Sequence, residues 1–147
     1  MMPSDISWFG CPTQIHLGLG SHGRIADVLD RLQVERLFIT LDPALVGGEF
    51  HHRVEAVLTD RRTVTATFTE IEPDPSVHTV ERALVVARDL KAQAVLAVGG
   101  GSTIDVAKAV AILMTQGGRI QDYEGGLCRA SQSRPPRVPG RRSQGRV

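Results

Sequence analysis

Long apolar runs and cysteines are scarce in this chain of 147 residues. No stretch approaches the roughly 18 to 20 apolar residues that a membrane-spanning helix needs, and the first residues contain no basic segment followed by an apolar one. We therefore expect a cytoplasmic protein with no membrane partner. Its two cysteines, Cys11 and Cys128, form no CxxC or Cys/His grouping, which argues against a disulfide framework and a zinc-ligand pattern.

Acidic side chains are missing from residues 129–147, which contain six arginines. The first 128 residues hold 11 basic and 16 acidic side chains, so they carry a charge of −5 and the remainder +6. This Arg/Pro/Ser/Gly-rich composition cannot bury enough apolar surface to offset the entropy of ordering. We expect residues 127–147 to be a disordered basic tail. One hypothesis is a frameshift after about Gly126, because GC-rich coding sequence read in a wrong frame tends to give such a composition.

Between about residues 14 and 114, short apolar runs alternate with segments of helical period. The pattern predicts strands at residues 14–17, 36–40, 63–68 and 94–98, each followed by a helix. The helix over about residues 77–91 would be capped by Ser76 or Asp74. A continuous apolar run such as 94–98 is typical of a parallel strand covered on both faces. The chain is therefore predicted to form one α/β domain of four βα units.

A glycine triplet follows the last predicted strand, and a helix follows the triplet. Without side chains, Gly99, Gly100 and Gly101 allow the backbone to turn sharply and approach a ligand. The free N–H groups and positive dipole end of the next helix would face this turn, which favours phosphate binding. The Ser102 hydroxyl could either cap that helix or bind a phosphate oxygen, and the sequence leaves both roles open.

Asp42 follows the strand at 36–40, just before Pro43. The carboxyl ends of parallel strands share one edge of a sheet, so Asp42 and the glycine turn are expected to lie together. A carboxylate there could accept hydrogen bonds from ribose hydroxyls while the turn holds a pyrophosphate. The pattern is not GxGxxG, and on residues alone a purely structural turn stays an alternative.

The string GGGSTIDVAKAVAIL, residues 99–113, resembles the GGGSxxDxAK nucleotide-binding signature of the iron-containing (group III) alcohol dehydrogenases. Flanking segments agree in order and spacing, namely PT at 12–13, GLG at 18–20, DPAL at 42–45, EPDPS at 72–76 and QDYEG at 121–125. The resemblance covers about residues 9–125. It implies that residues 9–126 form a Rossmann-like dinucleotide-binding domain with a parallel sheet.

The resemblance also implies an NAD(P)-dependent oxidoreductase that interconverts alcohols and aldehydes or ketones. NAD is favoured over NADP, because a 2′-phosphate would meet the negative charge of Asp42. Lys108 is expected to pair with Asp105, and a homodimer is one expectation, since family members are often dimers. The residues expected at the cofactor are Asp42, Gly99, Gly100, Gly101, Ser102 and Asp105.

Family members continue past the segment that resembles residues 121–125. They add a loop that completes the cofactor site and a helical domain in which one Asp and three His bind iron or another divalent metal. These positions are missing from the present sequence, so we assign no catalytic or metal-binding residue and expect the chain to be inactive alone. The pair His51 and His52 is expected to be solvated, since adjacent helical residues point about 100° apart.

Two alternatives remain from the sequence. The basic tail could be an arm that binds nucleic acid or an acidic partner, although it has no aromatic side chains to stack on bases. Glycerol dehydrogenases and dehydroquinate synthases also share the glycine triplet. The full GGGSTIDVAK string and the EPDP segment at 72–75 favour the iron-containing alcohol dehydrogenases.

Overall fold

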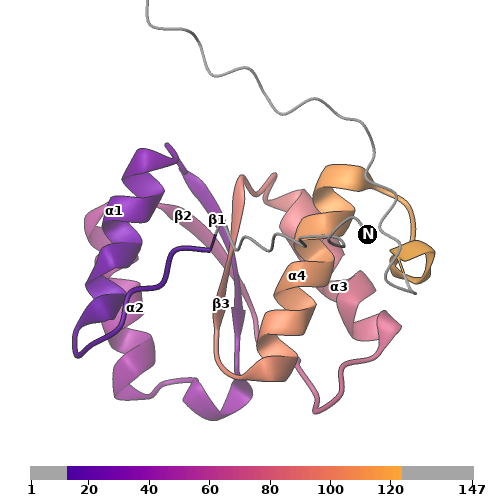
Figure 1. Ribbon diagram of the computed structural model, residues 1–147, viewed down its shortest axis with the longest axis horizontal. Coiled ribbons are helices and arrows are strands. Elements are labelled where there is room, and N and C mark those ends of the chain that lie inside the picture. The colour runs from indigo at the N-terminus through magenta and orange to yellow at the C-terminus, as the bar shows by residue number, and fades with distance from the viewer. Residues whose placement is uncertain (1–12, 124–147) are drawn as a thin grey trace, which may run out of the picture.

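The computed structural model describes residues 13–123, which form a three-stranded parallel sheet between two layers of helices (Figure 1). The strands are β1 (Arg36–Leu41), β2 (Val64–Phe68) and β3 (Ala94–Val98), in the order β2-β1-β3. β1 is central, and its Phe38 is in register with Ala66 of β2 and Val95 of β3. The predicted tail at residues 127–147 lies outside the described part of the chain.

The helices divide evenly between the two faces of the sheet (Figure 1). On one face lie α1 (Arg24–Arg31) and α2 (Glu49–Asp60), and on the other lie α3 (Val77–Asp89) and α4 (Gly101–Gln116). Short 3-10 turns complete the described elements, η1 (Ser21–Gly23), η2 (Pro43–Leu45) and η3 (Ile120–Tyr123). The predicted α/β class, with helices covering a parallel sheet, is confirmed. Within residues 13–123, no helix has the length and apolarity to cross a membrane.

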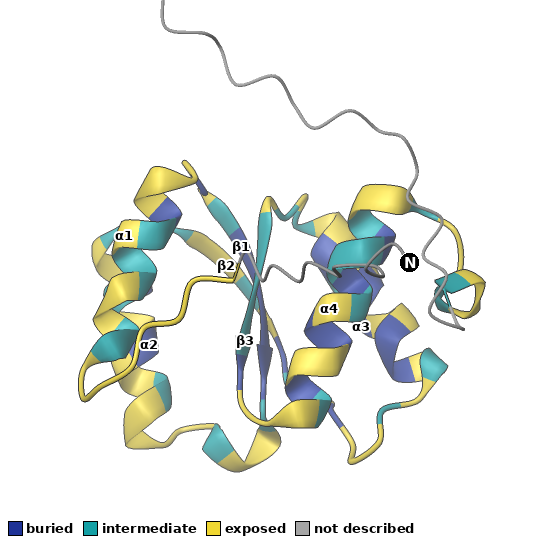
Figure 2. Cartoon of the chain, in the orientation of Figure 1, coloured by how far each residue is buried: buried dark blue, intermediate teal, exposed yellow. Residues whose placement is uncertain are grey.

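Alternation along β1 creates two separate apolar cores, one on each face of the sheet (Figure 2). Leu37, Ile39 and Leu41 face α1 and α2, where they pack with Leu29, Val54 and Leu58. Phe38 faces α3 and α4 and is fully buried. Side chains that point in opposite directions along one strand thus require a helical layer on each side.

The predicted strand at residues 14–17 is wrong, because this segment is irregular and exposed. Ile15 and Leu17, its two apolar side chains, are 73% and 92% exposed. A strand is stabilised by hydrogen bonds to a neighbouring strand and by burial of one face. Residues 14–17 have neither among the described elements, so this part of the chain contains three βα units.

The end of α3 lies two residues earlier than predicted, because the chain turns into the left-handed region at Lys91. Ser76 caps the start of α3, with its Oγ accepting the Thr79 N–H at 3.3 Å. After Asp89, the Ala92 N–H reaches the Ala87 carbonyl at 3.0 Å, and Lys91 has a φ of 54°. Such a position after a helix is usually filled by glycine.

Replacing Lys91 with glycine is therefore expected to raise the free energy of unfolding by about 0.5–1 kcal/mol, since glycine adopts positive φ without steric strain. Urea denaturation followed by circular dichroism would measure the change. Lys91→Ala is the matched control, because alanine removes the side chain but keeps the strain. Equal stabilities of the glycine and alanine variants would contradict the prediction.

Candidate functional site

Asp42 and Gly99 meet where β1 and β3 end. The Asp42 N–H donates to the Val98 carbonyl at 2.9 Å, which joins the two strand ends. A Cβ added to Gly99 would lie 2.7 Å from the Asp42 Cβ and 2.6 Å from the Thr103 Oγ1. Gly99 also has a φ of 153°. Only glycine lets the turn close this tightly on the aspartate.

Gly100 and Gly101, in contrast, face open space. A Cβ added to either one would meet no atom within 4 Å. Gly100 caps α4, whose first helical bond runs from the Ile104 N–H to the Gly100 carbonyl at 3.0 Å. The N–H groups of the first helical turn have no intrahelical partner and carry the positive end of the helix dipole. The open space therefore lies where an anion would be bound most favourably.

The start of α4 is fixed to the central strand by a buried hydrogen bond. The Thr40 Oγ1 donates to the Thr103 carbonyl at 3.2 Å, and both residues are at most 1% exposed. Because Gly100 is the capping residue, Ser102 lies in the first turn of α4 and does not cap it. This excludes helix capping, one of the two roles that the sequence left open for the Ser102 hydroxyl.

A hollow of about 340 Å³ lies between the end of β1 and the start of α4. The Asp42 carboxylate is oriented there by the Ala44 N–H, which donates to its Oδ1 at 2.9 Å. Glu72 brings a second carboxylate from the loop after β2. The complete lining is Asp42, Pro43, Ala44, Ile71, Glu72, Pro73, Ser102 and Thr103. The hollow thus combines acidic groups with the positive end of a helix.

The family model described as iron-containing alcohol dehydrogenase matches residues 12–139. The chain belongs to the iron-containing alcohol dehydrogenase family. Alcohol dehydrogenase 4 of Saccharomyces cerevisiae is 31% identical over 136 residues, which cover 92% of this chain and 35% of the yeast protein. Long-chain-alcohol dehydrogenase 1 of Geobacillus thermodenitrificans is 32% identical over 112 residues, covering 76% of this chain and 28% of that protein.

Solved structures agree with this membership of the iron-containing alcohol dehydrogenases. NADH-dependent butanol dehydrogenase A from Thermotoga maritima superposes with a TM-score of 0.73 at 29% identity, covering 80% of this chain and 30% of that chain. Sulfoacetaldehyde reductase from Bifidobacterium kashiwanohense, solved with NAD⁺, has the same fold, with a TM-score of 0.71 at 23% identity over 84% of this chain and 32% of that chain. This chain therefore spans about a third of the length of such relatives.

Glu72 is a member of the hollow that the sequence reasoning missed. Its Oε1 accepts the Ser76 N–H at 2.9 Å and the Thr79 hydroxyl at 2.8 Å. These hydrogen bonds, the backbone bond from Ser76 first, lower the pKa of Glu72 from 4.5 to about 2. The sequence did contain a signal for this role, namely an acidic residue four positions before the serine that caps α3. Glu72 therefore stays ionised beside the hollow across the neutral and mildly acidic range.

Acid is expected to remove the stabilising effect of Glu72. Because its pKa is lower in the folded chain, its contribution to stability is complete above about pH 4.5 and is lost as the pH falls towards 2. Urea midpoints measured at several pH values between 2 and 6 should fall more steeply for the natural chain than for Glu72→Gln. Parallel curves for the two proteins would show that these hydrogen bonds do not favour the ionised form.

Asp105 lies one turn further along α4, beyond the lining of the hollow. Its Oδ1 is 3.3 Å from the Lys108 Nζ, and both side chains are about two-thirds exposed. The expected ion pair between the two residues is present. Of the six residues expected at the cofactor, the structure brings Asp42, Gly99, Gly100, Gly101 and Ser102 to one edge of the sheet, with Asp105 next to that group.

The prediction that both adjacent histidines of α2 are solvated is wrong for His51, whose side chain is 18% exposed, whereas that of His52 is 65% exposed. Their rings stack 5.8 Å apart, and both approach Glu55, with the His51 Nε2 at 3.4 Å and the His52 Nδ1 at 3.3 Å. Among the described residues, this trio has the spacing of metal ligands. However, the His51 Nδ1 accepts the Gly47 N–H at 3.1 Å, so the proton of the neutral ring lies on Nε2, towards Glu55.

Proposed function

We propose that this chain supplies the NAD-binding part of an iron-containing alcohol dehydrogenase that interconverts alcohols and aldehydes or ketones. The observation that carries the proposal is the open space at Gly100 and Gly101 at the N-terminus of α4, next in the chain to Ser102, which lines the hollow with Asp42. A structural relative, sulfoacetaldehyde reductase, was solved with NAD⁺. When bound, NAD supplies the hydride acceptor for alcohol oxidation.

The residues of the hollow, together with the glycine turn and the start of α4 next to it, suit a dinucleotide. The pyrophosphate would lie against the first-turn N–H groups of α4, with Gly100 and Gly101 leaving room for its oxygens and Ser102 offering a hydroxyl. The Asp42 carboxylate would accept hydrogen bonds from the adenosine ribose. Gly99 keeps these two groups together. Asp105 would act from the second turn of α4, where it lies beside Lys108.

The two carboxylates favour NAD over NADP. Asp42 and Glu72 line the same hollow, and the low pKa of Glu72, about 2, keeps it negatively charged at neutral pH. A 2′-phosphate placed there would be repelled by both groups. This charge arrangement supports the preference for NAD that the family resemblance implied.

The described residues do not fit the iron. Their one trio with ligand spacing, on α2, points the His51 Nε2 proton at Glu55 and leaves no lone pair there for a metal. The trio also contributes nothing to the lining of the hollow beside Asp42. We therefore assign this chain the binding and orientation of the dinucleotide and derive no step through the metal.

Titration of the 147-residue chain with NAD and NADP, followed by protein-observed NMR, would test the proposal. We expect NAD to bind weakly, with a Kd of about 1 mM, and NADP to bind about tenfold more weakly. Shifted amide resonances should map to residues 99–103. Asp42→Asn should lower the ratio of the NADP Kd to the NAD Kd about threefold, because it removes one of the two negative charges. Lack of NAD-dependent shifts at these amides, or an NADP preference, would contradict the proposal.

A further inference from the structure

A groove of about 280 Å³ lies between α2 and the face that β1 and β2 present to it. Its two walls are rows of polar side chains. The row on α2 has one residue per helical turn, namely His51, Glu55 and Thr59. Every second residue at β2 forms the other row, namely Thr63, Thr65 and Thr67. The floor consists of core side chains that are at most 6% exposed, namely Ile39, Leu41, Val54, Leu58 and Val98.

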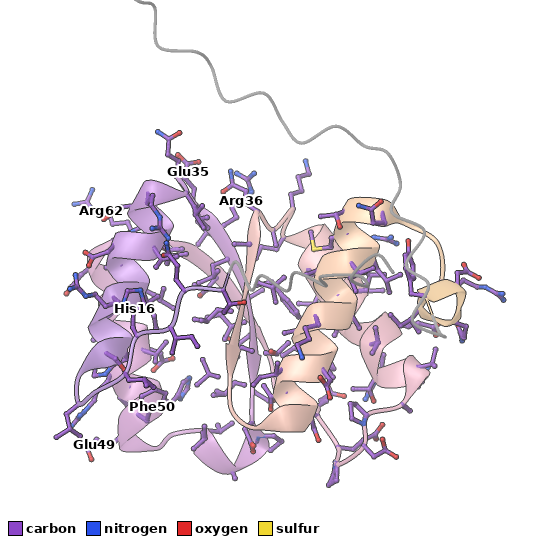
Figure 3. The ribbon with its side chains drawn as sticks, in the orientation of Figure 1. His16, Glu35, Arg36, Glu49, Phe50 and Arg62 are labelled. Carbon is purple, nitrogen blue, oxygen red and sulfur yellow. The ribbon has the colours of Figure 1, made fainter. Side chains whose placement is uncertain are left out.

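The groove carries negative charge at its centre. In a parallel β-α-β unit the helix runs antiparallel to the strands, and Figure 3 shows Glu49, at the start of α2, at the opposite end of the molecule from Arg36 and Arg62. The two rows therefore run in opposite directions, and Glu55 lies beside Thr65, each in the middle of its row. The Glu55 side chain is 54% exposed, and no lysine or arginine lines the groove.

The groove borders a sheet edge that has no strand paired with it among the described residues. β2 is in continuous register with β1 on its other side. Its sequence, VTATF, contains no charge and no proline, and the register contains no bulge. Natural proteins usually protect an exposed edge with such features, since a bare edge pairs readily with another strand.

The backbone groups of this edge alternate along β2. The Val64 N–H donates to the Glu35 carbonyl at 2.8 Å, on the β1 side. Because successive residues of a strand point their backbone groups to opposite sides, those of Thr65 and Thr67 point away from β1. Both residues are exposed. The edge therefore presents donors and acceptors to an incoming strand directly beside the groove.

The chemistry of the edge and the groove fits an extended peptide. Unpaired backbone groups recognise another backbone, and a groove beside them receives every second side chain of the added strand. The lining contains no cation to bind a phosphate and no Phe, Tyr or Trp to stack on a flat ring. Its floor is already covered, so the groove has no deep apolar cavity for a lipid chain.

We propose that β2 and this groove bind an extended segment of another protein as an antiparallel fourth strand, with a lysine or arginine opposite Thr65. A residue opposite Thr65 projects onto the same face of the sheet as the Thr65 side chain, towards α2. Only a long side chain reaches back over β2 to the Glu55 carboxylate. The central basic residue is thus selected by both charge and length.

The other face of β2 selects apolar residues in the partner. Val64 points to the α3 and α4 side of the sheet and is 56% exposed. The partner residue opposite Val64 projects to the same side, where an aliphatic side chain would cover it. The partner therefore alternates apolar residues with polar or basic ones. Its binding does not depend on the proposed function, because the groove shares no lining residue with the hollow beside Asp42.

NMR titration of the 147-residue chain with the capped peptide VTVKVTV would test this docking site. We expect a Kd of about 0.5 mM, with the largest shifts at the amides of Thr65 and Thr67. The peptide VTVEVTV should bind about tenfold more weakly, because its glutamate would meet Glu55. Methylation of the backbone nitrogen of the peptide lysine removes a donor opposite Thr65 and should abolish binding.

Charge reversal in the chain gives the complementary test. Glu55→Lys should exchange the preference, so that VTVEVTV binds more tightly than VTVKVTV. Glu81→Lys is the matched control, because Glu81 is similarly exposed, at 59%, and also lies near a histidine three residues earlier, but it is on α3 and does not line the groove. This control should keep the preference of the natural chain.

Two results with the peptides would overturn the proposal: VTVKVTV that shifts neither the Thr65 nor the Thr67 amide, or a preference that Glu55→Lys leaves unchanged. Hydrogen exchange without peptide adds a third. Protection of both amides that rises with the concentration of the chain would assign the edge to a second copy instead. NAD titration of the same samples reports on the proposed function separately, so failure of one proposal leaves the other unaffected.

Discussion

Gly99→Ala is expected to lower the free energy of unfolding by about 3 kcal/mol, through strain at a left-handed position and overpacking. The new methyl group would lie 2.6 Å from the Thr103 Oγ1 and 2.7 Å from the Asp42 Cβ, and the backbone there has a φ of 153°. Neither neighbour can retreat easily. Thr103 is 1% exposed, and the Asp42 backbone is held by the Val98 carbonyl.

Urea denaturation of Gly99→Ala and Gly100→Ala side by side would measure this effect. Gly100 has an ordinary φ of −88° and no neighbour within 4 Å of an added Cβ. Alanine there should cost less than about 1 kcal/mol, through its poorer capping of α4. If the two variants lose similar stability, the turn does not close on Asp42 as tightly as described.

Gly100→Val is expected to weaken NAD binding at least tenfold, while the chain stays folded. The valine side chain would occupy the open space in front of the first turn of α4, where the proposed pyrophosphate site lies. Loss of charge-assisted hydrogen bonds from that turn, each worth about 1.5–3 kcal/mol, is sufficient for such a decrease. NMR titration with NAD would measure the change.

Gly23→Val is the matched control for this experiment. Gly23 also caps a helix, and a Cβ there also meets no atom within 4 Å, but that helix is α1 and not α4, whose N-terminus is the proposed pyrophosphate site. Both variants place a β-branched residue at the capping position of a helix, where glycine is preferred to valine. If both variants bind NAD equally strongly, the glycine turn is not part of the cofactor site.

Much of this architecture could be predicted from short-range patterns. The apolar strand at 94–98, the glycine triplet and the following helix are each visible as local composition, and β3 and α4 lie where they were expected. Asp42 and the glycine turn could be placed together because parallel strands share a carboxyl edge. The DPAL segment also contains its own signal, since an aspartate before proline commonly caps a turn.

The remaining features depend on contacts that no local pattern contains. Residues 14–17 alternate like a strand, but a strand exists only where a neighbour pairs with it. The approach of Thr103 to Gly99 depends on the angle at which α4 leaves the sheet. The role of Glu72 depends on a loop that returns its carboxylate to Ser76 and Thr79. The stacking of His51 on His52 follows from their shared approach to Glu55, which helical spacing alone does not specify.

The two separate cores have a consequence for how binding and folding are coupled. Asp42 and η2 belong to the layer of α1 and α2, whereas the α4 N-terminus belongs to the layer of α3 and α4. A ligand in the hollow would contact both layers. It would therefore link two helical layers that otherwise interact through the three-stranded sheet between them. Partial opening of either layer would release the ligand, and saturation would slow the opening of both. The cofactor would then set the cooperativity of the domain as well as its stability.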